Sequence, residues 1–170
     1  MALPANRQHW LLDEGSLTEK LIQCCHPGQF HVEVVNQHWQ RPLYTEQKLL
    51  NMRRGELAFT RHVILNCDDD KWVFARTLIP ASSFKGRARR LALLKSKPLG
   101  AVLFSDSATR RLDMQVAAIN RTHLLYYLAQ SAAGFDEQVL WGRRTLFSYA
   151  GKLLLDNEIF LPSIPSESNT

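Results

Sequence analysis

The chain has 170 residues, of which 45% are hydrophobic and 22% are charged, a composition typical of one globular domain with a sizeable core. No apolar run reaches the ~18 residues that a membrane helix needs, and the first residues lack the pattern of a secretory signal. The net charge of +5 permits nucleic acid, an anionic membrane surface or a small acidic ligand as partner. The positions of the charges along the chain have to distinguish these three classes of partner.

The first half of the chain predicts a helix, a strand and a hairpin. Ser16 and Glu19 form a capping-box pattern that begins a helix, which ends near the His-Pro-Gly run. Residues 29–39 alternate well enough for a strand, and residues 45–56 fit a short helix or a turn. Residues 57–80 contain two β-rich runs around an Asp-rich turn, which predicts a hairpin.

The second half predicts two helices and a second hairpin. Residues 82–104 fit a basic amphipathic helix that a proline and a glycine interrupt. Residues 109–119 are ambiguous between a strand and a helix, whereas residues 121–135 predict a helix. Residues 139–162 predict a hairpin that turns at Ala150–Gly151.

Hairpins with helices between them indicate an α+β fold with an antiparallel sheet. No linker rich in Gly, Ser or Pro divides the chain, so we expect a single domain over residues 1–170. The polar tail of this domain is expected to be flexible from about residue 163.

Motifs for several chemistries are missing from the sequence. None of the six histidines pairs with another at the i, i+4 spacing and no CxxC occurs, so no metal site is predicted. The Asp68–Asp70 run lacks the glycine and the terminal glutamate of a calcium loop, which favours a solvated turn. No GxGxxG, GxxxxGK[ST] or GxSxG motif occurs, so neither a nucleotide cofactor nor a serine nucleophile is predicted.

The three cysteines are Cys24, Cys25 and Cys67. An odd number without regular spacing argues against a disulfide framework. A reducing compartment is the natural place for such a chain, so we expect it in the cytoplasm.

Basic residues concentrate in the segment 85–97. They could follow a phosphate backbone, or they could form the solvated face of a helix. No stacking aromatic residues are interleaved with them and no DNA-binding fold is visible, so the second interpretation is favoured and no nucleic-acid partner is predicted.

Two arginines, Arg61 and Arg76, lie inside the first predicted hairpin among apolar residues. A loop at Asp68–Lys71 would place both guanidinium groups on one face of the sheet, where they could bind a ligand that carries carboxylates. A three-residue loop would place them on opposite faces, so the sequence leaves both arrangements open.

Glu158 lies inside the last predicted strand between apolar neighbours. Strict alternation places it on the same face as Leu154, Asp156 and Phe160. Glu158 is either a surface residue of an edge strand or a buried acid that an arginine holds. In the second case it could bind a ligand hydroxyl or act as a general acid or base.

Five short segments follow one another in the chain: WLLDEGSLTEKL, TRHVILNCDDDKWVFARTLIP, KPLGAVLF, LWGRRTLF and GKLLLDNEIFLP. Together they resemble the chorismate pyruvate-lyase family from about Trp10 to Pro165. The resemblance implies a sheet of about six antiparallel strands with surrounding helices, which encloses a ligand site under helical flaps. It also implies conversion of chorismate into 4-hydroxybenzoate and pyruvate, the first step of ubiquinone biosynthesis, without a cofactor.

The resemblance carries family positions onto this chain one at a time. Substrate-binding positions correspond to Leu17, Arg61, Leu99 and Glu158, and catalytic positions to Glu158, Arg61 and Arg76. Leu17 stands where the family often has Met, so a contact through the backbone would survive and a contact through sulfur would not. The segment 120–139 is longer than in compact members, which could alter the flaps but leaves the matched positions in place.

The expected partners are therefore chorismate and 4-hydroxybenzoate, and the protein is expected to be a monomer. In this interpretation Arg61 holds one carboxylate, and Arg76 stabilises the other carboxylate or the ether oxygen. Glu158 accepts a hydrogen bond from the ring hydroxyl and could remove the C4 hydrogen, or it only orients the substrate. The alternative is a domain of the same fold that binds a small acid as an effector and catalyses nothing.

Overall fold

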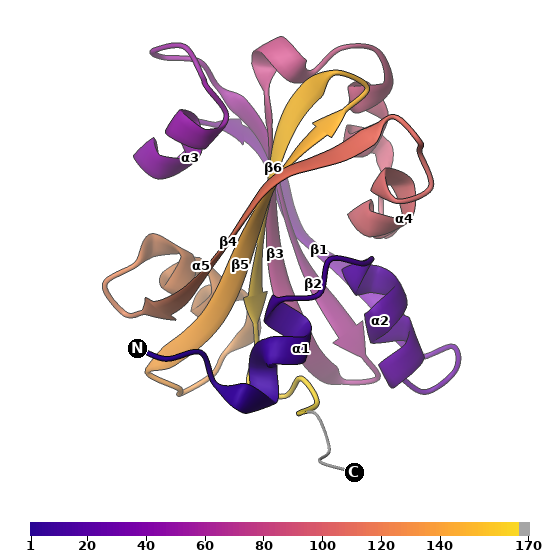
Figure 1. The fold of residues 1–170 in the computed structure, drawn as a ribbon, viewed down its shortest axis with the longest axis vertical. Coiled ribbons are helices and arrows are strands. Elements are labelled where there is room, and N and C mark those ends of the chain that lie inside the picture. The colour runs from indigo at the N-terminus through magenta and orange to yellow at the C-terminus, as the bar shows by residue number, and fades with distance from the viewer. Residues whose placement is uncertain (167–170) are drawn as a thin grey trace.

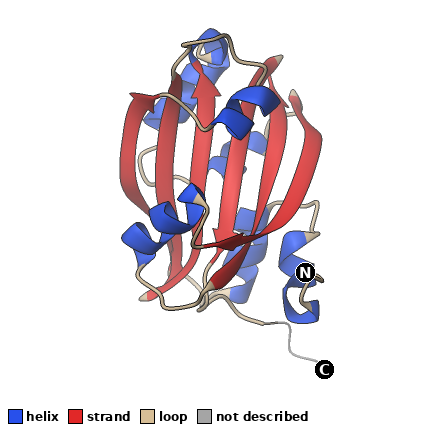
Figure 2. Cartoon of the chain, turned by 90° about the vertical axis from the view of Figure 1, so that its left-hand side faces the viewer, coloured by secondary structure: helices blue, strands red, loops and turns tan. Residues whose placement is uncertain are grey.

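The computed structural model describes residues 1–166, which form one six-stranded antiparallel sheet with short helices around it (Figures 1 and 2). The α+β prediction is therefore confirmed. The strand order is β1-β2-β3-β6-β5-β4. The strands are β1 Phe30–Gln40, β2 Ala58–Cys67, β3 Asp70–Pro80, β4 Thr109–Asn120, β5 Val139–Tyr149 and β6 Lys152–Phe160.

Within residues 1–166, five α-helices and three 3-10 helices connect or cover these strands. The α-helices are α1 Gln8–Leu11, α2 Leu17–Cys24, α3 Tyr44–Leu49, α4 Leu99–Leu103 and α5 Leu124–Ala133. The 3-10 helices are η1 Ala5–Arg7, η2 Ala81–Ser83 and η3 Gly86–Leu93. No helix within residues 1–166 has the length and apolarity that crossing a bilayer requires.

Local sequence signals explain two of these elements. Ser16 caps α2, since its hydroxyl accepts a hydrogen bond from the backbone N–H of Glu19 at 3.3 Å. Ala150 and Gly151 have positive φ angles of 50° and 78°, the left-handed conformations that join two strands in a tight hairpin. Both predictions are confirmed.

Two expectations about local structure need correction, and one open alternative is decided. The basic segment forms the 3-10 helix η3 instead of an amphipathic α-helix. The segment 109–119, which was ambiguous between a strand and a helix, is the strand β4. The tail does not become free at residue 163, because Ile164 is buried and Trp10 donates to the carbonyl of Pro165 at 2.8 Å. The rest of the predicted tail, 167–170, lies outside the described residues.

Apolar clusters cover both faces of the sheet. On one face, α1 and α2 pack at one end, and η3 and α4 pack at the other. On the opposite face, α5 packs on Ile64, Phe74 and Ile159, and α3 is followed by Leu50, which packs on Leu78. The long segment 120–139 therefore adds a helix to the face away from α2 and α4.

The register of β2 against β3 decides where the two strand arginines point. The turn is shorter than either loop considered above, since Cys67 pairs with Asp70, and the register shifts between Leu65 and Asn66. As a result, Arg61 is the cross-strand partner of Thr77, and Arg76 is the cross-strand partner of His62. Paired residues share a face and neighbours alternate, so the two arginines lie on opposite faces of the sheet.

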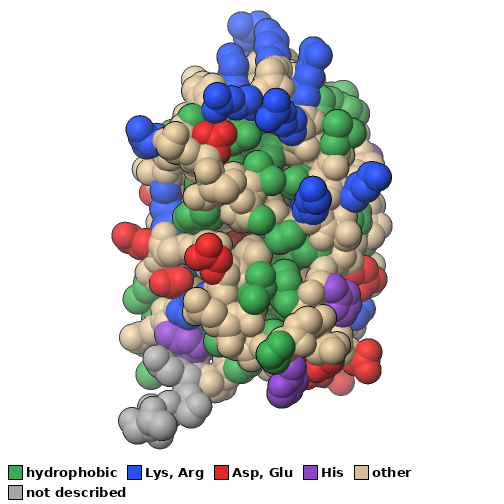
Figure 3. Space-filling view, turned by 90° about the vertical axis from the view of Figure 1, so that its right-hand side faces the viewer, with side chains coloured by type: hydrophobic (Ala, Val, Ile, Leu, Met, Phe, Trp, Pro, Cys, Tyr) green, Lys and Arg blue, Asp and Glu red, His purple; other side chains and the backbone are tan. Residues whose placement is uncertain are grey.

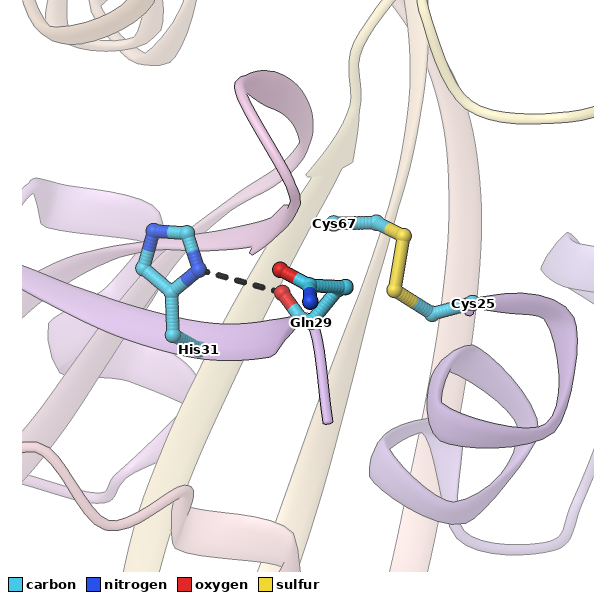
Figure 4. The surroundings of a disulfide bond; sticks show 4 residues. All are labelled: Cys25, Gln29, His31 and Cys67. Carbon is cyan, nitrogen blue, oxygen red and sulfur yellow. Dashed lines mark hydrogen bonds between the residues drawn. A yellow bond between two sulfur atoms is a disulfide. The ribbon is translucent and has the colours of Figure 1, made fainter. Parts of the chain in front are cut away.

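A disulfide joins Cys25, just after α2, to Cys67 at the end of β2 (Figure 4). The argument from cysteine number against a disulfide was therefore wrong. Counting could not show that the two residues meet across 42 positions of sequence. The bond fastens the far end of α2 to the sheet, while Cys24 stays free and exposed.

Basic side chains gather at one end of the face drawn in Figure 3. The segment 85–97 carries six Lys and Arg side chains, all of them exposed, and no acid. The rest of the chain holds fifteen basic and sixteen acidic residues, so this segment accounts for the whole positive net charge.

Candidate active site

A small cavity lies between the sheet and the helices α2 and α4. Its walls take Val63 and Ala75 from the cluster under α2, and Leu103 and Phe147 from the cluster under α4. Five charged residues also line it: Arg61, Arg111, Arg143, Asp156 and Glu158. An apolar chamber with a few convergent charged groups is the usual form of a site for a small ligand.

Glu158 is buried and paired with an arginine from the neighbouring strand. It is 9% exposed, and Arg143 donates from Nε to its Oε2. The two residues are direct cross-strand partners in β5 and β6. This contact excludes the interpretation of Glu158 as a surface residue of an edge strand, since β6 is a central strand between β3 and β5.

Arg143 also connects the site to the N-terminal helices. Its Nη1 donates to the carbonyl oxygens of Trp10 at 3.0 Å and Asp13 at 2.7 Å. The guanidinium group therefore anchors the chain between α1 and α2 while it neutralises Glu158.

Arg61 is 3% exposed and points into the opposite side of the cavity. Its Nη2 donates to the carbonyls of Lys95 at 2.9 Å and Lys97 at 3.0 Å, which lie on the loop before α4. Its buried Nε has no hydrogen-bond partner among residues 1–166. Burial lowers the pKa of Arg61, and the nearby Asp156 acts in the other direction.

Arg111 of β4 supplies a third guanidinium group. Its Nη1 donates to the carbonyl of Glu14 at 2.6 Å, and its buried Nε also lacks a partner within the described part of the chain. Burial lowers its pKa, and the positive charge of Arg143 lowers it further. Arg61 and Arg111 thus each keep a donor for a ligand.

Asp156 lies two residues before Glu158 on the same face of β6 and lines the same cavity. Thr77 donates from Oγ1 to its Oδ1 at 2.9 Å. Burial raises the pKa of Asp156 well above its ordinary value, and the charge of Glu158 raises it further. Thr77, Arg143 and Arg61 lower it, but by less.

The cover of the cavity contains both of the predicted apolar contact residues. Leu17 begins α2 and Leu99 begins α4, and both line the cavity. The two helices touch at Gly100, where a Cβ atom would come within 2.7 Å of the Thr18 hydroxyl oxygen. The cavity volume is about 40 Å³. The helices α2 and α4 together cover it.

Arg76 does not reach this cavity, contrary to the prediction that it acts beside Arg61. On the opposite face its Nε and Nη2 donate to the two carboxylate oxygens of Glu46 at 2.9 and 3.0 Å. Its Nη1 lies 2.7 Å from Nε2 of His62. Asn157 also donates to Glu46, which is 1% exposed. Arg76 therefore fastens α3 to the sheet.

The sequence model of the family described as chorismate lyase matches residues 1–169. The chain belongs to the chorismate lyase family. Two relatives named "Probable chorismate pyruvate-lyase" support this. The protein from Aromatoleum aromaticum is 39% identical over 164 residues, covering 95% of this chain and 88% of the relative. The protein from Methylococcus capsulatus is 37% identical over 159 residues, covering 94% and 96%.

Solved structures share the fold of this chorismate lyase family member at low sequence identity. The ligand-binding domain of a GntR-family transcriptional regulator from Bordetella bronchiseptica matches with a TM-score of 0.58 at 15% identity, covering 82% of this chain and 88% of that chain. A GntR-family regulator from Bacillus cereus matches with a TM-score of 0.60 at 8% identity, covering 84% and 99%. At this identity the likeness concerns the fold alone.

Sequence reasoning placed four cavity residues, Leu17, Arg61, Leu99 and Glu158, but missed Arg143, Arg111 and a role for Asp156. A signal for Arg143 was present, because a hairpin that turns at Ala150–Gly151 sets it opposite Glu158. Arg111 could not be placed, since its segment was ambiguous between strand and helix.

Proposed function

We propose that the chain is a chorismate pyruvate-lyase that converts chorismate into 4-hydroxybenzoate and pyruvate in the cavity under α2 and α4. Membership of the chorismate lyase family gives the activity. The observation that carries the site is the enclosed apolar chamber in which Glu158 and three arginines converge.

Two arginines suit the two carboxylates of chorismate. Arg61 and Arg111 each have a buried Nε without a partner among residues 1–166, and a guanidinium edge binds a carboxylate through parallel hydrogen bonds. Arg143 is occupied by Glu158 and by two backbone carbonyls, so it positions the acid instead of the substrate. Leu17, Leu99 and the other apolar walls would enclose the ring.

The protein has to fix the conformation of chorismate and stabilise the negative charge that develops on the departing enolpyruvate oxygen. The ether bond at C3 breaks, and its electron pair leaves with the enolpyruvate oxygen. The C4 proton leaves, and the electrons of that C–H bond complete the aromatic ring. A proton on the enolpyruvate methylene carbon gives pyruvate, so the atoms balance without a redox change. Glu158 would accept the C4 proton or, if the departing methylene takes it, would orient the ring hydroxyl.

A direct assay tests this proposal. Purified protein mixed with chorismate should produce 4-hydroxybenzoate and pyruvate in equal amounts, measured by absorbance and by a coupled dehydrogenase. The effector-binding alternative predicts binding of both acids without turnover. It is the less favoured function because the family and the named relatives are lyases, whereas the regulators resemble this chain in fold alone. If purified protein in excess over chorismate forms no 4-hydroxybenzoate, the lyase proposal is refuted.

The setting of the activity is also proposed. We propose a monomer with one domain over residues 1–170 that acts in the cytoplasm in the first step of ubiquinone biosynthesis. The disulfide Cys25–Cys67 weighs against a reducing compartment, since such bonds are rare there. Light scattering of the purified protein tests the monomer. Cell fractionation with thiol labelling tests the compartment and the bond together.

A further inference from the structure

We propose that Asp156 is a neutral carboxylic acid in the substrate cavity and donates a hydrogen bond to an anionic oxygen of the bound ligand. This role concerns a residue that the family resemblance did not single out. The proposal deepens the proposed function, because it names a second acid of the same site and sets the charge of the ligand that the site accepts.

Two carboxyl groups, those of Asp156 and Glu158, line the cavity. Among the described residues, Glu158 forms an ion pair with an arginine and Asp156 does not. Glu158 receives the guanidinium Nε of Arg143. Within the described part of the chain, the one hydrogen bond to Asp156 comes from the hydroxyl of Thr77. The cross-strand partners of Asp156 are Thr77 and Thr145. Two acids that share one enclosed cavity do not both ionise readily, and the charge goes to the one with the ion pair. The proton therefore belongs on Asp156.

The groups that face Asp156 from other strands are consistent with this assignment. Arg61 on β2 and Arg143 on β5 favour its anion, and Glu158 on its own strand opposes it. Arg143 donates to Glu158, and Arg61 donates from Nη2 to two backbone carbonyls, so neither is hydrogen-bonded to Asp156 among residues 1–166. Burial, the largest influence on the pKa of Asp156, favours the neutral form.

A neutral Asp156 offers the cavity a hydrogen-bond donor. Its Oδ1 accepts from Thr77, so the proton resides on the other oxygen. Asp156 is partly accessible although it lies within the sheet, and the residue lines the cavity. An acid in this position can donate to a carboxylate or to the oxygen that becomes negative as the ether breaks.

The charges of the cavity then match a dicarboxylate. Three arginines and one ionised glutamate give a net charge of +2, which balances two carboxylates. An ionised Asp156 would lower this to +1 and would place a second carboxylate charge of the protein beside the ligand. Ionisation of Asp156 should therefore weaken the binding of an anionic ligand.

Infrared difference spectroscopy tests the protonation state without any reliance on catalysis. The difference between wild type and Asp156→Asn at neutral pH should show the C=O band of one protonated carboxylic acid. Asn has the same shape and does not titrate, so it is the matched control. A carboxylate band in place of the acid band would overturn the proposal.

Binding of 4-hydroxybenzoate, measured by calorimetry, tests the donor. Asp156→Asn keeps a neutral donor and should keep the affinity within about threefold, whereas Asp156→Leu removes the donor and should weaken binding at least about tenfold. Equal affinities of the two folded variants would overturn the donor role. If the acid band and this difference appear but chorismate is not turned over, the lyase proposal fails and the assignment of Asp156 stands.

Discussion

Arg61 and Arg76 lie on neighbouring strands but serve different faces of the sheet. Arg61 lines the cavity, and its Nε has no hydrogen-bond partner among the residues that the structure describes. Arg76 instead contacts Glu46 and His62. The same side-chain chemistry therefore has a ligand-binding role in one case and a structural role in the other. The difference arises from strand register, because paired residues lie on the same face and Arg76 pairs with His62, the neighbour of Arg61 in β2.

Substitution of each arginine by methionine should separate the two roles. Arg61→Met should weaken 4-hydroxybenzoate binding by at least about tenfold, since a charged hydrogen bond is lost. Arg76→Met should leave the affinity of the folded protein nearly unchanged but lower the free energy of unfolding by about 3–5 kcal/mol, because Glu46 stays buried without its partner.

Calorimetry and urea denaturation measure the two quantities. The double variant Glu46→Met with Arg76→Met is the control for the second role. It should recover much of the lost stability, since both buried charges are then gone. Loss of ligand affinity in a well-folded Arg76→Met protein would contradict the placement of Arg76.

Glu158 is the residue whose substitution tests the chemical step. Glu158→Gln removes the base but keeps the shape and one hydrogen-bonding oxygen. We expect kcat to fall by about 10²–10⁴-fold with a much smaller change in product affinity. Single-turnover kinetics separates this step from product release. A loss of kcat below about tenfold would make Glu158 an orienting group and would favour proton transfer to the departing side chain.

At the scale of elements, the two ends of α2 have different roles. Leu17 at its start covers the cavity, and Cys25 just beyond its end is bonded to Cys67. We expect the start of α2 to move when a ligand enters, because Leu17 lies over the cavity, whereas the disulfide restrains the other end. The cover would then open at the contact between α2 and α4 without detaching α2 from the sheet.

Removal of this disulfide should destabilise the protein measurably. A closed loop of 42 residues corresponds to about 4 kcal/mol in the chain-entropy description. Cys67→Ser should lower the free energy of unfolding by a few kcal/mol in urea denaturation, and reductant should lower that of wild type similarly. Cys24→Ser is the matched control and should change nothing. Equal stabilities of wild type with and without reductant would show that the bond contributes nothing.

At the scale of the whole molecule, one face of the sheet carries the candidate active site and the other carries a buried polar group that stabilises the fold. One face carries the cavity, and the other carries the buried group of Arg76, Glu46, His62 and Asn157 under α3. The pKa of His62 is lowered to about 4, mainly by burial and then by the charges of Arg76 and His38. The supporting face is therefore sensitive to acid.

Global stability should fall as the pH drops from 6.5 towards 4. The folded protein keeps His62 neutral, while the unfolded chain binds a proton below a pKa of 6.5, so acid favours unfolding. The contribution of His62 is present in full above 6.5 and is lost by up to about 3 kcal/mol near pH 4. Urea denaturation across this range measures it. His62→Gln should remove most of the slope, and an unchanged slope in that variant would exclude His62 as its cause.

The sequence by itself determined the elements whose signals are local. Ser16 and Glu19 specify the start of α2, and Ala150–Gly151 specifies the second hairpin. Alternation along β6 placed Asp156 and Glu158 on one face, and the five matched segments pointed to the family. These features depend on neighbours in the chain, so their physical causes can be read from a short stretch of residues.

The tertiary structure alone decided which distant residues meet. A short turn and a shift after Leu65 moved Arg76 to the face of Glu46. Packing brought Arg111 to the cavity and joined Cys25 to Cys67. Strand register and the docking of helices result from the burial of many side chains at once, and a one-residue change reverses a face. No local pattern contains that information.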